Sequence, residues 1–134
     1  MVAAAQTGMA QRATEYAAAY ASERIAFGKP IASFQGISFL LADAFSRTEQ
    51  ARLEILDAAS LMLDGCDPEA VSAAVSAAVA YASENAAETT RNAVQVLGGH
   101  GFMTDYPVEQ WYRTAAFLST LDFDPLASSF QPAF

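Results

Sequence analysis

A chain of 134 residues is long enough for one domain with a buried core, and 53% of its residues are hydrophobic. The net charge of -8 disfavours nucleic-acid binding, while one cysteine and one histidine exclude an internal disulfide and lead us to expect no metal site. No apolar run approaches the ~20 residues of a membrane span and no export signal is visible, so we expect a cytoplasmic protein.

The first half of the chain predicts two long helices, because an alanine-rich sequence with few β-branched runs favours helices over strands. The first is predicted over residues 2–26, before Gly28 and Pro30, and the second from residue 31 or 33 to residue 63, before Gly65. The apolar stripe of the first helix consists of Met9, Ala13, Tyr16 and Tyr20. The apolar positions of the second are Ile37, Leu40, Leu41, Ala44, Phe45, Ala51, Ile55, Ala58 and Met62.

The residues that follow the second helix are typical of a helix N-terminus. Asp67 can cap the backbone, Pro68 has its φ already set, and Glu69 lies near the positive end of the helix dipole. We therefore predict a third helix that ends at about Leu97. Its face of small residues, which allows neighbouring helices to approach closely, consists of Val71, Ala74, Val75, Ala78, Ala82 and Asn85.

A fourth, shorter helix is predicted over residues 107–118, since Pro107 suits a first helical position. No helical period is visible after it. The connections are short, so helices that follow each other in sequence should be neighbours in space. The sequence thus predicts an all-α antiparallel four-helix bundle over residues 1–118 and an irregular tail over residues 119–134.

Three motifs point together to one family. They are RIAFGKP at residues 24–30, FQG at residues 34–36 and QVLGGHGF at residues 95–102. With these separations they resemble the C-terminal helical domain of the acyl-CoA dehydrogenases, and the resemblance covers about residues 2–113. It implies FAD as the cofactor, an acyl-CoA thioester as the substrate and α,β-dehydrogenation as the reaction.

The resemblance also implies which residues hold the cofactor. In the family, the glutamine and paired glycines of the third motif lie against the adenosine end of FAD, while residues of the first two motifs contact the FAD of a neighbouring subunit. A guanidinium fork suits a pyrophosphate, and glycines let a ligand lie against bare peptide groups. The cofactor-binding residues implied for this chain are Arg24, Phe27, Gln35, Gln95, Gly98 and Gly99.

Each of these motifs also has a purely structural interpretation. Gly98 and Gly99 can serve only to end a helix, which is the commonest use of glycine there. Arg24 can act as a cation at the negative end of the first helix. His100, between two glycines, is interpreted as a loop residue, with a pH-sensitive contact as the alternative.

The segment YPVEQWYR at residues 106–113 extends the resemblance toward the catalytic region. The family usually has aspartate after the arginine, whereas Arg113 is followed here by Thr114, so a structural ion pair is the other interpretation of Arg113. Counting onward without gaps, the catalytic glutamate of the family corresponds to Asp122, whose side chain is shorter by one methylene. Asp122 is therefore the candidate catalytic base, and an exposed acid in the tail is the alternative.

The expected function follows from what the resemblance includes and omits. We expect the C-terminal domain of an acyl-CoA dehydrogenase, as a fragment, split subunit or truncated product that contributes FAD contacts and an oligomer interface. Dehydrogenation would need the family's other two domains, so the expected partner is a second copy or a complementary acyl-CoA dehydrogenase chain. The alternatives are a non-catalytic helical assembly protein derived from the family, and a flavin enzyme that acts on a compound other than a thioester.

Overall fold

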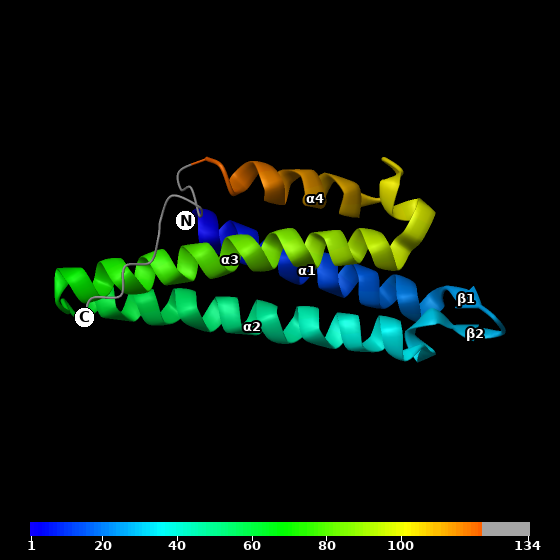
Figure 1. Cartoon of the computed structure of the whole chain (residues 1–134), viewed down its shortest axis with the longest axis horizontal. Coiled ribbons are helices and arrows are strands. Elements are labelled where there is room, and N and C mark those ends of the chain that lie inside the picture. The colour runs from blue at the N-terminus through cyan, green and yellow to red at the C-terminus, as the bar shows by residue number, and fades with distance from the viewer. Residues whose placement is uncertain (122–134) are drawn as a thin grey trace.

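Four α-helices make up most of residues 1–121, the residues that this computed structural model describes (Figure 1). The helices are α1 (Val2–Glu23), α2 (Gln35–Leu63), α3 (Pro68–Leu97) and α4 (Pro107–Leu118). The helix α3 contacts each of the other three, and the shorter α4 lies against α3 and α1. The predicted all-α four-helix bundle is confirmed. Most of the predicted tail lies outside the described residues, so the boundary at residue 118 stays a prediction.

A short hairpin joins α1 to α2, and the sequence pattern did not predict it. The strand β1 (Ile25–Ala26) pairs antiparallel with β2 (Lys29–Pro30), and the 3-10 helix η1 (Ile31–Ser33) follows. Phe27 and Gly28 form the turn with φ values of 52° and 81°. Positive φ at both residues is what a two-residue hairpin loop requires.

The hairpin changes the predicted ends of the first two helices. The first helix ends at Glu23 rather than at residue 26, because Arg24 leaves the helical conformation with φ -70° and ψ 117°. The chain can then enter β1. The second helix begins at Gln35 rather than at residue 31 or 33, because the preceding residues adopt the tighter 3-10 geometry of η1.

The third and fourth helices begin where the sequence predicts. The Asp67 carboxylate accepts hydrogen bonds from the backbone N–H groups of Glu69, at 3.1 Å, and Ala70, at 3.2 Å. These N–H groups have no partner within the helix, so the carboxylate supplies one. Pro107 is the first residue of α4, as its fixed φ favours.

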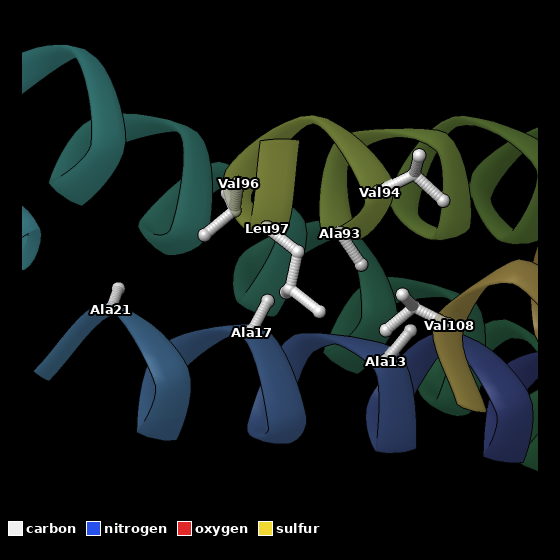
Figure 2. Packing of buried hydrophobic residues seen from close by; sticks show 8 residues of the cluster. All are labelled: Ala13, Ala17, Ala21, Ala93, Val94, Val96, Leu97 and Val108. Atoms are coloured by element: carbon white, nitrogen blue, oxygen red, sulfur yellow. The ribbon is translucent and has the colours of Figure 1, made fainter. Parts of the chain in front are cut away.

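The main hydrophobic core lies where α1, α3 and α4 meet. Its buried residues are Ala13, Ala17, Ala21, Ala93, Val94, Val96, Leu97 and Val108. Figure 2 shows the three alanines of α1 pointing toward α3, with Val108 of α4 close to Ala13. Since alanine has only a methyl group, the α1 and α3 backbones can lie close together along this line.

The predicted stripe of the first helix does pack against the core, but its large residues lie at the margin of the buried face. Ala13 is fully buried, but Met9, Tyr16 and Tyr20 are only partly buried. The larger side chains lie beside the close helix contact rather than inside it, as in the edge-on contact of Tyr16 with Trp111 at 5.8 Å between centroids. The centre of the buried face is instead formed by Ala10, Ala13, Ala17 and Ala21.

Buried hydrogen bonds connect the three long helices. The Asn85 amide on α3 donates to the Thr48 hydroxyl on α2 at 3.3 Å and accepts from the Thr89 hydroxyl at 3.1 Å. The Gln6 amide on α1 donates to the Ser83 hydroxyl at 3.3 Å. Because buried polar groups are costly when unpaired, these bonds favour one relative position of the helices.

The outer face of α2 exposes several large apolar side chains among polar ones. Phe45, one of the predicted apolar positions of this helix, is 61% exposed. The helix is buried through Ala44, Ala51 and Ala58, so residues on its opposite face are left uncovered by the described part of the chain. No helix within residues 1–121 is long and apolar enough to cross a membrane.

Candidate functional site

A groove of about 500 Å³ lies at the end of the bundle that carries the β1–β2 hairpin and the α3–α4 connection (Figure 1). It is lined by Tyr20, Arg24, Ile31, Val96, Leu97, Gly98, Gly99, His100 and Met103. Arg24 comes from the end of α1, whereas the glycines follow α3. The fold thus brings three of the predicted cofactor residues together, namely Arg24, Gly98 and Gly99.

Two glycines shape the groove by allowing the chain to turn sharply after α3. Gly98 has φ 60° and ψ -131°, a conformation that side chains strongly disfavour, and its N–H bonds to the carbonyls of Val94 and Gln95. The 3-10 helix η2 (Gly98–Phe102) follows. A Cβ on Gly101 would lie 2.5 Å from the Val94 carbonyl oxygen, so η2 can pack on α3 only with glycine there. The helix-ending role of Gly98 is confirmed.

Gly99 is different, because nothing in the described chain requires a glycine at this position. Its φ is not positive, and a Cβ built on it would meet no atom within 4 Å. Gly99 is exposed and lines the groove. It therefore leaves a stretch of bare backbone open to a ligand.

Arg24 contributes a cation without a partner to the groove. Within residues 1–121, its guanidinium forms no hydrogen bond or ion pair. It is exposed at the C-terminal end of α1, so the predicted placement of a cation at the negative end of this helix is confirmed. The arginines that do pair with carboxylates are Arg12, Arg47, Arg52 and Arg113.

His100 is held more firmly than its interpretation as a loop residue implied. Its Nδ1 lies 2.8 Å from the Tyr20 hydroxyl, and its ring packs against Tyr106 at 5.2 Å between centroids. Tyr20 lies in the last turn of α1, and Tyr106 immediately precedes α4. Only the fold shows that the three rings are neighbours.

The remaining predicted cofactor residues are exposed around this end of the bundle but do not line the groove. Phe27 is 95% exposed at the hairpin turn and packs edge-on against Phe34. Gln35 is exposed at the start of α2, and Gln95 is exposed in the last turn of α3. The candidate base Asp122 lies outside the described residues.

Arg113 has the structural role that was its alternative interpretation. Its guanidinium forms a bidentate ion pair with the Glu109 carboxylate one helical turn earlier. The Nε–Oε2 distance is 2.8 Å and the Nη2–Oε1 distance is 3.1 Å. Within residues 1–121, no group of three or more potential metal ligands is arranged around a common point.

Comparison with known proteins identifies the fold family. Residues 1–122 match the family model of the acyl-CoA dehydrogenase C-terminal domain. The chain belongs to the acyl-CoA dehydrogenase family. The resemblance inferred from the three motifs is thus confirmed, and acyl-CoA dehydrogenases are FAD-dependent oxidoreductases.

Individual relatives agree with this assignment. An acyl-CoA dehydrogenase of Bacillus subtilis (strain 168) is 46% identical over 116 residues, which are 85% of this chain and 29% of the relative. The butyryl-CoA dehydrogenase of Megasphaera elsdenii superposes with a TM-score of 0.84 at 36% identity, covering 88% of this chain and 30% of that one. The FAD complex of PigA gives a TM-score of 0.84 at 26% identity, covering 90% of this chain and 30% of that one. The chain thus spans under a third of the length of these relatives.

Proposed function

We propose that this chain forms one wall of the FAD site of an acyl-CoA dehydrogenase that introduces an α,β double bond into an acyl-CoA thioester. The observation that carries the proposal is the shared groove of Arg24, Gly98 and Gly99. Family membership supplies the reaction class, and the groove supplies a place where this domain can contact the cofactor. A cytoplasmic location stays a prediction.

The chemistry of the groove fits the nucleotide half of FAD. The free guanidinium of Arg24 suits the diphosphate, because its planar fork can donate two hydrogen bonds to phosphate oxygens. The open backbone at Gly99 suits a flat group that must lie close to the chain. Gln95, one turn before the groove, offers an exposed amide with both donors and an acceptor.

The residues of this chain would bind and orient the cofactor. When bound, FAD supplies the hydride acceptor of the reaction. Phe27 projects from the hairpin turn and is free to contact the cofactor of a neighbouring subunit, and Gln35 lies exposed at the start of α2. We keep Asp122 as the proposed base for the α-proton of the thioester.

The groove needs further walls to retain FAD. All six proposed cofactor residues are exposed, so a ligand bound to residues 1–121 alone would stay largely in water. Binding then gains too few contacts to offset the lost freedom of the ligand. We therefore propose that the remaining walls come from the domains that the relatives have beyond this one, in this polypeptide, in a second copy or in a complementary chain.

The test is FAD retention by the completed enzyme. The purified chain is mixed with a chain carrying the other two domains, and bound FAD is measured by visible absorbance after gel filtration. Arg24→Ala should weaken FAD binding about tenfold or more, since a hydrogen bond to a charged group contributes roughly 1.5–3 kcal/mol. Gln95→Ala should weaken it less.

Arg12→Ala is the control, because Arg12 lies on α1, which ends just before Arg24, but pairs with Glu15 outside the groove. It should retain FAD as the unchanged chain does. The proposal fails if the mixture retains no FAD, or if Arg24→Ala and Gln95→Ala both leave the affinity unchanged.

The second candidate function is a non-catalytic helical assembly protein. The exposed apolar face of α2 favours it, because large apolar side chains in water commonly mark a contact surface. The exposed large apolar side chains of α2 outside its buried stripe are Phe39, Phe45, Leu53, Leu56 and Leu63. A colourless but stable oligomer would support this function over the first.

Two phenylalanines of equal exposure allow a matched test of self-association. Phe45 on α2 and Phe117 on α4 are each 61% exposed. If α2 forms the interface, Phe45→Glu should lower the sedimentation coefficient to that of a monomer, whereas Phe117→Glu should not. A monomeric unchanged chain would exclude assembly through this face alone.

A further inference from the structure

His100 occupies a defined position in the groove, held from two other elements. Its Nδ1 is 2.8 Å from the Tyr20 hydroxyl of α1, and its ring contacts that of Tyr106, the residue that precedes α4. Tyr20 and Tyr106 also meet each other at right angles, at 6.5 Å between centroids. Two rings from separate parts of the chain thus hold the imidazole, which lines the same groove as Arg24.

The lining of the groove carries positive charge only. Among the described residues that form it, none is acidic, although the chain has 15 aspartates and glutamates and a net charge of -8. The titratable groups that face His100 are Tyr20 and Tyr106, and Arg24 shares its groove. The side chains contributed by α3 and η1 are the apolar Val96, Leu97 and Ile31.

Two carboxylates lie at this end of the bundle but form no ion pair with the histidine within residues 1–121. Glu23 precedes Arg24 and Asp105 precedes Tyr106, and both are exposed. A charge gained by the imidazole is therefore available to an anion that enters the groove.

Protonation would give His100 two N–H donors. One of them meets the Tyr20 hydroxyl, so the other is left for a ligand, together with a positive charge. With the free guanidinium of Arg24, the groove then presents two cations. This is the chemistry that recognises phosphate oxygens.

We infer that His100 is a proton-dependent anion contact that acts together with Arg24 on the diphosphate group of a bound dinucleotide. The inference rests on the proposed FAD site and adds a residue to it. Tyr20 is a positioning residue, because it holds the imidazole rather than the ligand. The affinity for diphosphate is accordingly higher when the imidazole carries a second proton than when it is neutral.

The single histidine makes the inference directly measurable. The chain has one imidazole, so its Cε1–H proton gives one NMR signal that can be followed across the pH range. Titrations are run with inorganic pyrophosphate and with sodium chloride at equal ionic strength. Two unit charges about 4 Å apart in water favour the protonated form roughly fivefold, so pyrophosphate should raise the midpoint of this titration by about 0.7 pH unit.

Variants separate a ligand contact from a merely structural role. Arg24→Ala should remove most of the rise in the midpoint, and Arg12→Ala should preserve it. Tyr20→Phe should reduce the rise, because the imidazole is no longer held in place. Pyrophosphate changes its own charge with pH equally for both proteins, so its affinity, measured from the Gly98 and Gly99 amide signals, is compared between the unchanged chain and His100→Gln at each pH. The advantage of the unchanged chain should be roughly fivefold when the imidazole is protonated and should disappear when it is neutral.

Two results would overturn the inference. In the first, pyrophosphate leaves the midpoint of the imidazole titration unchanged although the Gly98 and Gly99 amide signals still respond to it. The groove would then bind anions without a contribution from His100. The other is no response of these amides or of the imidazole at any pH. Because FAD retention is measured separately in the completed enzyme, a positive pyrophosphate result with no FAD retention would overturn the proposed function alone.

Discussion

Gly99 and Gly101 show how two glycines in one loop can serve different purposes. Gly101 is buried, and a Cβ there would lie 2.5 Å from the Val94 oxygen and 2.9 Å from its Cα. Backbone atoms cannot move aside as a flexible side chain can. A Cβ on Gly99 would instead extend into open space. The fold therefore requires a glycine at residue 101, whereas nothing in residues 1–121 requires one at residue 99.

We predict that Gly101→Ala lowers the free energy of unfolding by about 1–3 kcal/mol, as overpacking of a close contact commonly does. Gly99→Ala should change it by less than about 0.5 kcal/mol, because the new methyl group meets no atom. Urea denaturation followed by circular dichroism measures both values. Equal losses in the two variants would contradict this account of the loop.

The stability of the helix α3 depends on its N-terminal cap. The helix has 30 residues and starts in an exposed connection, so no buried neighbour satisfies its first N–H groups. Asp67 accepts from two of them and also places a negative charge near the positive end of the helix dipole. The start of the helix is therefore determined locally.

We predict that Asp67→Ala lowers the free energy of unfolding by about 1 kcal/mol, since both bonds to the cap are lost. Asp67→Asn should cost less, because the amide oxygen keeps an acceptor and only the charge is removed. Thermal unfolding of the three proteins under the same buffer conditions would rank them. An Asn variant as unstable as the Ala variant would show that charge, not the cap, is what matters.

Close packing of the helices across the whole bundle brings the groove residues together. The alanines of α1 let α3 lie against it along the length of the core (Figure 2). The end of α1 then meets the loop after α3, and Tyr20 reaches His100. The spacing of the long helices and the geometry of the groove are therefore coupled.

We predict that Ala17→Leu lowers the free energy of unfolding by about 1–3 kcal/mol, because Ala17 is fully buried between helices. Ala19→Leu on the exposed side of the same helix is the control and should stay within about 0.5 kcal/mol. Guanidinium denaturation measures both. If Ala17→Leu were tolerated as well as Ala19→Leu, the alanine contact would not set the helix spacing.

Local sequence signals determined much of this protein. Asp67, Pro68 and Pro107 mark helix starts through bonds and dihedral angles that involve only nearby residues, so α3 and α4 begin where predicted. The motifs at residues 24–30 and 95–102 identified the family, because their residue types and separations are specific. The hairpin was missed, since two residues per strand leave too short a pattern to detect.

Only the tertiary structure decided which apolar residues are buried and which site residues meet. Periodicity shows which residues share a helix face but not which face has a partner, so it placed Phe45 among the apolar positions of the second helix without showing that its side chain is 61% exposed. It also cannot show that a close contact favours alanine over the tyrosines beside it. Arg24 and Gly99 share a groove, and His100 bonds to Tyr20, because α1 and α3 run in the same direction side by side and so end at the same end of the bundle. Such contacts between distant parts of the chain depend on packing, which no local pattern encodes.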